Sequence, residues 1–182
     1  MKLHLGCGDR YIDGYVNVDG YDMANHDTSR KGSTYDLKAN ILEKLPFDDG
    51  SIDEIMIIHV MEHFYRWQSI SLLNEFRRLL KKGGIVIIEM PDLDRCIEWY
   101  TSGGRCGGKT IGTPLGRLNK GFTQFYGNQW DELEYETHKY VWTQEEIVEE
   151  MKKVGFSITE LTNKTKYHMS GRDMRIVGVM NK

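Results

Sequence analysis

The stretch HLGCGDRYIDGYVNVDG, His4–Gly20, decides the predicted fold of this chain. It begins inside a short alternating segment, Lys2–Leu5, whose pattern predicts a β-strand. The chain then turns through Gly6 and Gly8 and enters a second alternating segment, Tyr15–Asp19, which predicts another strand. The connection is too short for a crossover helix, which with its turns normally takes about a dozen residues or more. We therefore expect a turn, or at most one short helical turn, between these two strands.

Further along the chain, predicted strands alternate with predicted helices. The isoleucine-rich run Ile52–Val60 is typical of a strand buried on both faces, and helical spacing follows in Gln68–Lys82. Gly83 and Gly84 are expected to end that helix. A second helix is predicted to begin at the capping box Thr143–Glu146. The remaining predicted strands are Thr34–Asn40, Gly84–Met90, Phe156–Leu161 and Met174–Met180.

This alternation predicts an α/β fold, with a mostly parallel sheet and helices packed on its faces. The last two of the seven predicted strands flank a polar segment, so we expect them to pair antiparallel at a sheet edge. In such sheets, ligands bind outside the carboxyl ends of the strands. The loops expected to border one crevice follow Leu5, Asp19, Asn40, Ile58 and Met90.

The first of these loops has the features of a cofactor site. Gly6 and Gly8 allow the backbone to turn sharply and allow a ligand to lie against it. Asp19 ends the second strand, where a carboxylate can accept both hydroxyls of a ribose. However, Tyr11 occupies the place of the third glycine of the dinucleotide fingerprint, and Asp19 follows Gly8 by only 11 residues. Since about 20 residues are normal for a dinucleotide site, this spacing disfavours NAD and FAD.

A second glycine-rich stretch, GGRCGGKT at Gly103–Thr110, matches the phosphate-binding loop of nucleotide hydrolases. That loop functions between a strand and the N-terminus of a helix, where free N–H groups bind phosphate. Here the preceding segment is helical or irregular in pattern, and the next residues include Gly112, Pro114 and Gly116, which disfavour a helix. We therefore interpret the match as coincidental and keep a nucleotide-binding protein as a disfavoured alternative.

The ordered set LHLGCG, VNVD, ANILEKLPFDDGSIDEIMIIHVMEH and LLKKGGIVIIEMPD resembles class I S-adenosylmethionine-dependent methyltransferases. Within that family it is most similar to the small bacterial enzymes of type 11, often found beside glycosyltransferases. The C-terminal KYVWTQEEIVEEMKKVGFSITEL is similar to the last helix and strand of the family. The resemblance covers the chain except roughly residues 93–137. It implies a Rossmann-like, seven-stranded sheet with an antiparallel final strand pair and helices on both faces.

The resemblance also implies a cofactor, S-adenosyl-L-methionine, which leaves as S-adenosyl-L-homocysteine. Gly6, Cys7 and Gly8 would then lie against its methionine part, and Asp19 would bind the ribose hydroxyls. Ile41 would pack on the adenine. Asn40 stands where the family usually has an aspartate that takes the adenine amino group, so a charge is lost there. His59 would face the cofactor near its reactive methyl. Alternatively, Gly6, Gly8 and Asn40 are only turn residues, Asp19 is a solvated acid at a strand end, and His59 is a buried core histidine. The cofactor-binding prediction comprises Gly6, Cys7, Gly8, Asp19, Asn40, Ile41 and His59.

Residues 93–142 are predicted to form an acceptor-side or lid segment inserted into one domain, 1–182. The segment mixes aromatic with polar residues, which suits an apolar pocket with a few polar anchors: Phe122, Phe125, Tyr126, Asn128, Gln129, Trp130, Tyr135, His138 and Tyr140. A sugar or another hydroxyl compound is the expected acceptor. If it must lose a proton, His59 and His138 are the candidate general bases, and His63 is a weaker one. The glycine stretch 103–110 would act as a hinge or lid.

The composition restricts the class of partner. The formal net charge of −3 provides no broad basic surface for nucleic acid or anionic membrane. The N-terminus lacks a secretory signal pattern, so we expect a cytoplasmic protein. Three dispersed cysteines indicate neither a disulfide framework nor a zinc site, and we predict no metal ligands. The oligomeric state stays open, as does the alternative of a non-catalytic protein that binds S-adenosylmethionine.

Overall fold

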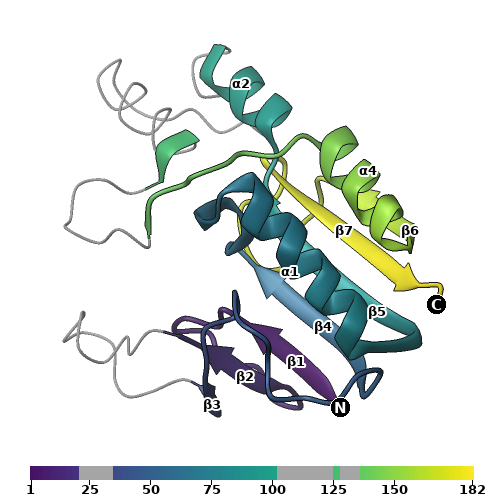
Figure 1. Cartoon of the computed structure of the whole chain (residues 1–182). Coiled ribbons are helices and arrows are strands. Elements are labelled where there is room, and N and C mark those ends of the chain that lie inside the picture. The colour runs from purple at the N-terminus through teal and green to yellow at the C-terminus, as the bar shows by residue number, and fades with distance from the viewer. Residues whose placement is uncertain (21–34, 102–124, 128–135) are drawn as a thin grey trace.

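The computed structural model describes residues 1–20, 35–101, 125–127 and 136–182. One seven-stranded sheet runs through the molecule, in the order β3-β2-β1-β4-β5-β7-β6 (Figure 1). Its strands are β1 (Lys2–Leu5), β2 (Val16–Asp19), β3 (Leu37–Lys38), β4 (Ile52–Ile58), β5 (Leu80–Pro91), β6 (Phe156–Thr162) and β7 (Asp173–Met180).

The pairing of these strands confirms the predicted topology. Strands β1 to β5 are mutually parallel, whereas β7 pairs antiparallel with both β5 and β6. Because β7 runs the opposite way, its first residue, Asp173, pairs with Pro91 at the carboxyl end of β5. Between β1 and β2 the chain makes turns closed by Arg10 N to Cys7 O and Tyr15 N to Ile12 O, with no crossover helix, as expected.

Two helices, α1 (Arg66–Leu79) and α4 (Gln144–Val154), lie side by side on one face of the sheet, in front of it in Figure 1. Alternate residues of the central strands point toward these helices, since side chains alternate along a strand. They form one continuous core with the buried faces of both helices, and its fully buried members include Leu3, Leu5, Ile55, Ile57, Leu73, Phe76, Val86, Ile88, Ile147 and Met151. At this packed face, a Cβ on Gly178 would lie 2.7 Å from Met151 Cε.

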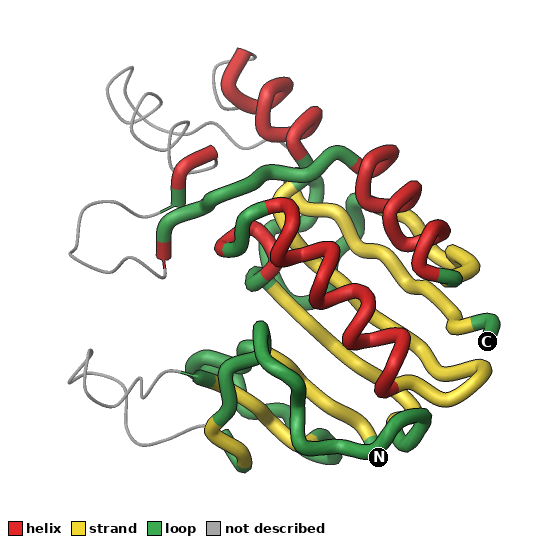
Figure 2. The backbone as a smooth tube through the Cα atoms, viewed as in Figure 1, coloured by secondary structure: helices red, strands yellow, loops and turns green. Residues whose placement is uncertain are grey.

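The opposite face of the sheet is polar toward its carboxyl end. It carries the buried side chains of His4, Asn17, Glu89 and Arg175. In the described ranges, loop residues cover this face: Lys166 and Tyr167 each donate a backbone N–H to the Glu89 carboxylate. In Figure 2 loops and turns, drawn in green, form many of the connections around the sheet.

The helix boundaries differ in one respect from the prediction. Helix α1 ends at Leu79, before the two glycines, because Leu80 is already extended and begins β5. Helix α4 begins as predicted, with Thr143 Oγ1 accepting a hydrogen bond from Glu146 N. The Glu146 carboxylate binds Arg66 and Tyr140, so it connects α4 to α1.

Two shorter helices follow strands of the sheet. The 3-10 helix η2 (Met61–His63) follows β4, and α2 (Leu93–Thr101) follows β5. Both lie beyond carboxyl ends of parallel strands, at the edge where α/β sheets bind ligands. None of the helices in the described ranges is long and apolar enough to cross a bilayer.

Candidate active site

The first loop depends on the absence of a side chain at Gly6. This residue has φ +65°, a left-handed conformation that favours glycine. A Cβ at Gly6 would lie 2.4 Å from Val60 Cγ2. The loop after β1 is therefore packed directly against the residue that follows His59, and two of the predicted strand-end segments are in contact.

Asp19 lies where the prediction put it, at the end of β2 and next to the same loop. Its side chain is buried, with 8% of the residue exposed. Gly8 N donates to Asp19 Oδ2 at 2.8 Å, while Gly8 itself has φ +54° with no heavy atom within 4 Å of an added Cβ, neighbouring residues aside. The carboxylate thus holds the glycine loop through Gly8 N, and the open space at Gly8 suits the close approach of a ligand.

Cys7, between these glycines, is buried and held as a thiol. Burial raises its pKa to about 12, and the nearby Asp19 carboxylate adds to the effect. Its backbone N–H donates to Val18 O. The side chain is therefore unsuited to nucleophilic attack, in agreement with a purely backbone role in the loop.

Asn40 and Ile41 follow β3 next to the same edge. Ala39 N donates to Asp19 O at 2.9 Å, which places this loop beside β2. Asn40 is exposed, and its side chain closes a local turn by accepting from Leu42 N and donating to Glu43. Ile41 is buried in the core. These contacts are the ones expected if Asn40 serves as a turn residue. Its side-chain oxygen has a second lone pair, which can still accept a hydrogen bond from an adenine amino group.

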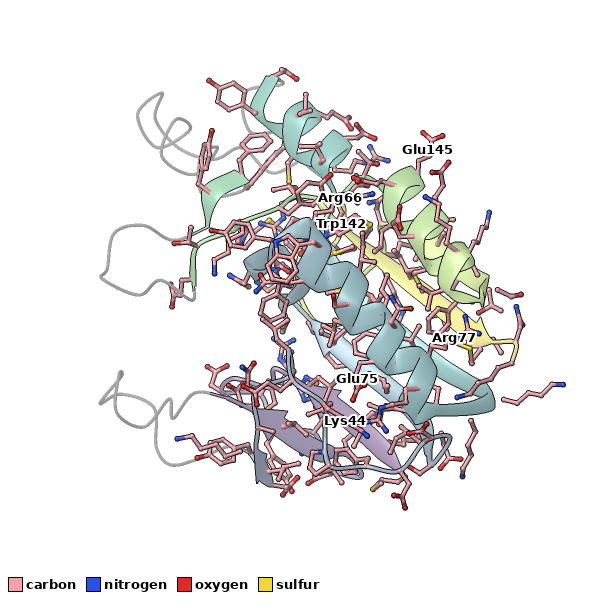
Figure 3. All side chains as sticks on the ribbon, in the orientation of Figure 1. Lys44, Arg66, Glu75, Arg77, Trp142 and Glu145 are labelled. Atoms are coloured by element: carbon pink, nitrogen blue, oxygen red, sulfur yellow. The ribbon has the colours of Figure 1, made fainter. Side chains whose placement is uncertain are left out.

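Beside Ile41, residues 41–44 and one side of α1 enclose a hollow of about 320 Å³. Figure 3 labels two residues of its lining, Lys44 and Glu75. Ile41 is the one predicted cofactor residue among those that line it. Neither the glycine loop, Gly6–Gly8, nor Asp19 is part of its lining.

His59 has a strained backbone and two carboxylate partners. Its φ of +53° is unusual for a residue with a side chain. Its Nδ1 lies 2.8 Å from Glu62 Oε1, and its Nε2 lies 2.8 Å from Asp173 Oδ2. Burial opposes the charged ring, but the two carboxylates outweigh burial and raise the pKa of His59 to about 9. His59 is therefore a cation with both ring nitrogens engaged, which is the wrong state for a general base.

Glu62 is the centre of a second group with His63 and His138. One ligand-type atom from each of these three residues lies within 4.8 Å of the others. Burial would raise the pKa of Glu62, but His59, and beyond it His63 and His138, lower it to about 2. Lys139 N and Tyr140 N both donate to Glu62 O, so the chain bearing His138 is fastened to η2.

Trp142 anchors the same returning segment between the two long helices. It is fully buried, and the Arg66 guanidinium lies 5.9 Å from its ring (Figure 3). In Figure 2 residues 137–142 run as a loop past the start of α1 to α4. The position of His138 is thus set by packing at both ends of this loop.

Asp173 and His168 were not among the predicted site residues. Asp173 is fully buried and accepts from His59, from His168 Nδ1 at 3.0 Å and from Met169 N at 3.0 Å. Arg172 also donates to its carboxylate. Burial would raise the pKa of Asp173, but these donors hold it well below its usual range. The sequence signal was weak because both residues stand beside a turn that was interpreted only as part of an edge hairpin.

The structure therefore brings the predicted residues into two neighbouring groups. The first group lies at the carboxyl ends of β1, β2 and β3 and comprises Gly6, Cys7, Gly8, Asp19 and Asn40. The second is the histidine and carboxylate cluster after β4, which includes His59 and His138. Val60 links the groups through its contact with Gly6. The glycine stretch 103–110 and the aromatic residues Phe122, Trp130 and Tyr135 lie outside the described residues.

Comparison with known proteins agrees with this fold. The methyltransferase domain family matches residues 3–161. A Mycolicibacterium smegmatis protein, named for S-adenosylmethionine-dependent methyl transfer, is 28% identical over 98 residues, covering 50% of this chain and 37% of that protein. The match thus spans well under half of that curated relative.

Two solved structures of SAM-dependent methyltransferases are similar along nearly the whole chain. The Methanosarcina mazei protein has a TM-score of 0.63 and 16% identity, with coverage of 99% of this chain and 92% of that one. The Thermotoga maritima protein has a TM-score of 0.60 and 18% identity, with coverage of 99% and 82%. At such identity these structures show the fold alone.

The chain belongs to the methyltransferase domain family. The family match and the shared fold confirm the predicted class, a class I methyltransferase whose cofactor is S-adenosylmethionine.

Proposed function

We propose that this chain transfers the methyl group of S-adenosylmethionine to a hydroxyl group of a small molecule, with a sugar as the favoured acceptor. The observation that carries the proposal is the contact between the two groups of site residues. Gly6 of the cofactor loop packs on Val60, next to His59 and the Glu62–His63–His138 group. The methyl group of a cofactor bound at this loop would thus lie near side chains that can accept the proton of a hydroxyl group.

Methyl transfer from a sulfonium is an in-line displacement with a good leaving group. Positioning and the exclusion of water therefore supply much of the catalysis. Gly8 and Asp19 position the cofactor in this proposal, and Ile41 packs on its adenine. A base is required only where the acceptor must lose a proton, as a sugar hydroxyl must.

His59 has a positioning role in this proposal. Each of its ring nitrogens already lies 2.8 Å from a carboxylate, so neither nitrogen is available to accept a proton from a substrate. It fixes Glu62 against Asp173 instead. His138 becomes the favoured proton acceptor, because it comes from the acceptor segment and is held beside Glu62.

Residues 93–142 form the acceptor side of a single domain in this proposal. Tyr126 is 55% exposed and lies next to Gly127, which pairs with Thr137 directly before His138. An exposed aromatic ring near a polar cluster suits a sugar, whose apolar face stacks on rings while its hydroxyls bind polar groups.

Calorimetric titration with S-adenosylmethionine and S-adenosylhomocysteine tests the cofactor part, with Mg-ATP as the negative control. We expect both sulfur compounds to bind, Asp19→Ala to abolish binding, and Asp48→Ala to leave it unchanged, since Asp48 is exposed and outside the site. Binding that survives Asp19→Ala would contradict the assigned role of Asp19. Binding of Mg-ATP in place of both sulfur compounds would favour the nucleotide alternative.

Release of S-adenosylhomocysteine in the presence of sugars, other hydroxyl compounds and amines tests the acceptor. We expect turnover with a hydroxyl compound, and a loss of about 10²–10⁴-fold in kcat for His138→Ala with cofactor binding retained. Turnover with amines alone would contradict the hydroxyl proposal. Cofactor binding without turnover of any acceptor would favour the non-catalytic binding protein.

A further inference from the structure

We propose that Glu62, His63 and His138 bind one divalent transition-metal ion. The sequence alone predicts no metal site, because the third residue lies 75 positions after the second. The fold brings one ligand-type atom from each residue within 4.8 Å of the others. Metal–nitrogen and metal–oxygen bonds of about 2.0–2.2 Å would draw these side chains together by a further small movement.

The Glu62 carboxylate supplies the observation that points to a cation. Only 1% of this residue is exposed, and its Oε1 is ion-paired with His59. Its Oε2 is buried and has no hydrogen-bond donor within the described ranges. A buried carboxylate oxygen without a partner is costly. A metal ion at Oε2 would remove that cost and leave the pair with His59 intact.

His63 is oriented as metal-binding histidines usually are. Its Nδ1 lies 3.3 Å from the carbonyl oxygen of Thr137, which can only accept, so Nδ1 carries the proton in this contact. In the neutral ring, Nε2 then carries the lone pair. A backbone carbonyl that fixes the ring in this manner is a common outer partner of metal-binding histidines.

His138 is supplied by a backbone held in place on both sides. His138 N donates to Tyr126 O at 3.0 Å, and Lys139 N donates to Glu62 O at 2.8 Å. The rings of His63 and His138 have centroids 5.0 Å apart and are nearly perpendicular, at 79°. The segment that carries His138 thus also supplies the Thr137 carbonyl that orients the ring of His63.

A neighbouring group, His59, His168 and Asp173, also has metal-type residues in reach of one another. Its carboxylate is already saturated, because Oδ2 of Asp173 accepts from both histidines and from Met169 N. Arg172 donates to the other oxygen. A cation at Oδ2 would have to displace these hydrogen bonds, so the geometry favours the Glu62 group.

Two imidazoles and one carboxylate suit zinc, iron, cobalt or nickel rather than magnesium or calcium. Three protein ligands leave coordination positions open for another molecule. The role that follows rests on the proposed function: an acceptor hydroxyl bound to the metal would be more acidic. In the metal-bound protein His138 would be a ligand, and the hydroxyl made acidic by the metal would lose its proton to solvent water.

The test uses the full chain without an affinity tag, freed of metal by a chelator. Co²⁺ is titrated in while its visible absorption is followed, and Zn²⁺ is titrated by calorimetry, both without S-adenosylmethionine. We expect about one ion per chain. Glu62→Gln and His63→Gln should each weaken binding at least about tenfold, while the matched control His168→Gln should retain wild-type affinity.

Thermal unfolding of each metal-free variant, together with its S-adenosylmethionine affinity, shows whether the fold is intact. Equal metal binding in wild-type and His63→Gln protein would overturn the proposal. So would metal binding lost in His168→Gln but kept in His63→Gln, or no binding by the folded wild-type protein. Since these titrations need neither cofactor nor acceptor, a failed metal site and a failed methyltransferase proposal give different results.

Discussion

At the scale of single residues, Gly6 is the position where the loop geometry tolerates least change. An alanine there must keep a left-handed backbone, which costs about 1–2 kcal/mol, and its Cβ would lie 2.4 Å from Val60 Cγ2. Overpacking typically adds about 1–3 kcal/mol. We predict that Gly6→Ala lowers both the free energy of unfolding, measured in urea, and the affinity for S-adenosylmethionine.

Gly14→Ala is the matched control for this prediction. Gly14 has φ +84°, but nothing outside its chain neighbours lies within 4 Å of an added Cβ. Its substitution should therefore cost only the backbone conformation, about 1–2 kcal/mol, with the cofactor affinity unchanged. Equal losses of stability in the two variants would show that the Val60 contact is not the constraint.

Cys7 offers a prediction about reactivity. Its pKa of about 12 keeps it protonated at neutral pH, and the thiolate is the reactive form. Iodoacetamide should therefore modify Cys7 far more slowly in the folded chain than after unfolding in guanidinium, as measured by peptide mass spectrometry. Because the pKa is raised, the rate should increase as the pH rises toward 12. Rapid modification of the folded chain at neutral pH would contradict this burial.

Sequence reasoning found site residues unevenly, and the reason is local order. Gly6, Gly8 and Asp19 could be chosen because each stands at or just after the end of a recognisable strand. His59 could be chosen for the same reason, yet its partner Asp173 lies 114 positions away. The antiparallel pairing of β7 with β5 brings Asp173 to His59. No local sequence pattern near either residue predicts this contact.

At the scale of elements, Arg78 joins α1 to the loop before β4. Its guanidinium donates to the carbonyls of Leu45 and Phe47 and to the carboxylates of Asp49 and Glu75. Hydrogen bonds to charged groups contribute roughly 1.5–3 kcal/mol. We predict that Arg78→Leu lowers the free energy of unfolding by about 2–4 kcal/mol, measured in urea.

Arg77 provides the control on the same helix. In the described ranges its side chain is seen donating one hydrogen bond, to Val154 O, and Figure 3 shows it at the lower end of α1. Arg77→Leu should cost about 1 kcal/mol. If the two variants lost equal stability, the loop contacts of Arg78 would have no special weight.

Element boundaries show a second limit of sequence reasoning. Helical spacing and the pair Gly83–Gly84 predicted a helix continuing to Lys82, whereas α1 ends at Leu79 and β5 begins at Leu80. Leu80 is fully buried in the strand. A leucine fits a buried helix position equally well, so its hydrophobicity could not distinguish the two conformations. Pairing with Ile52 of β4 stabilises the extended form, and that partner is visible only in the folded sheet.

At the scale of the whole molecule, the order of strands and helices was predictable because each segment carries its own pattern. The polar face of the sheet was not, because its contacts cross long separations. Glu89 points away from the main core, and it is fully buried. It pairs with Arg175 at 2.8 Å and accepts from two backbone N–H groups of the loop before β7. That loop leads to His168 and Asp173, so one buried ion pair supports the cluster beside the site.

This arrangement gives the last prediction. Glu89→Gln leaves the Arg175 guanidinium buried without its closest carboxylate, and breaking such a pair typically costs about 3–5 kcal/mol. The same arginine also binds Glu160, whose side chain is 43% exposed, so Glu160→Gln should cost only about 0–1 kcal/mol.

Urea unfolding measures the free energy of unfolding of both variants. Hydrogen exchange should show loss of protection at Lys166 and Tyr167 in Glu89→Gln alone. Because removing both charges leaves no buried cation that has lost its closest carboxylate, Glu89→Gln combined with Arg175→Met should be more stable than Glu89→Gln alone. Equal stability of the two carboxylate variants would mean that burial does not decide the strength of this network.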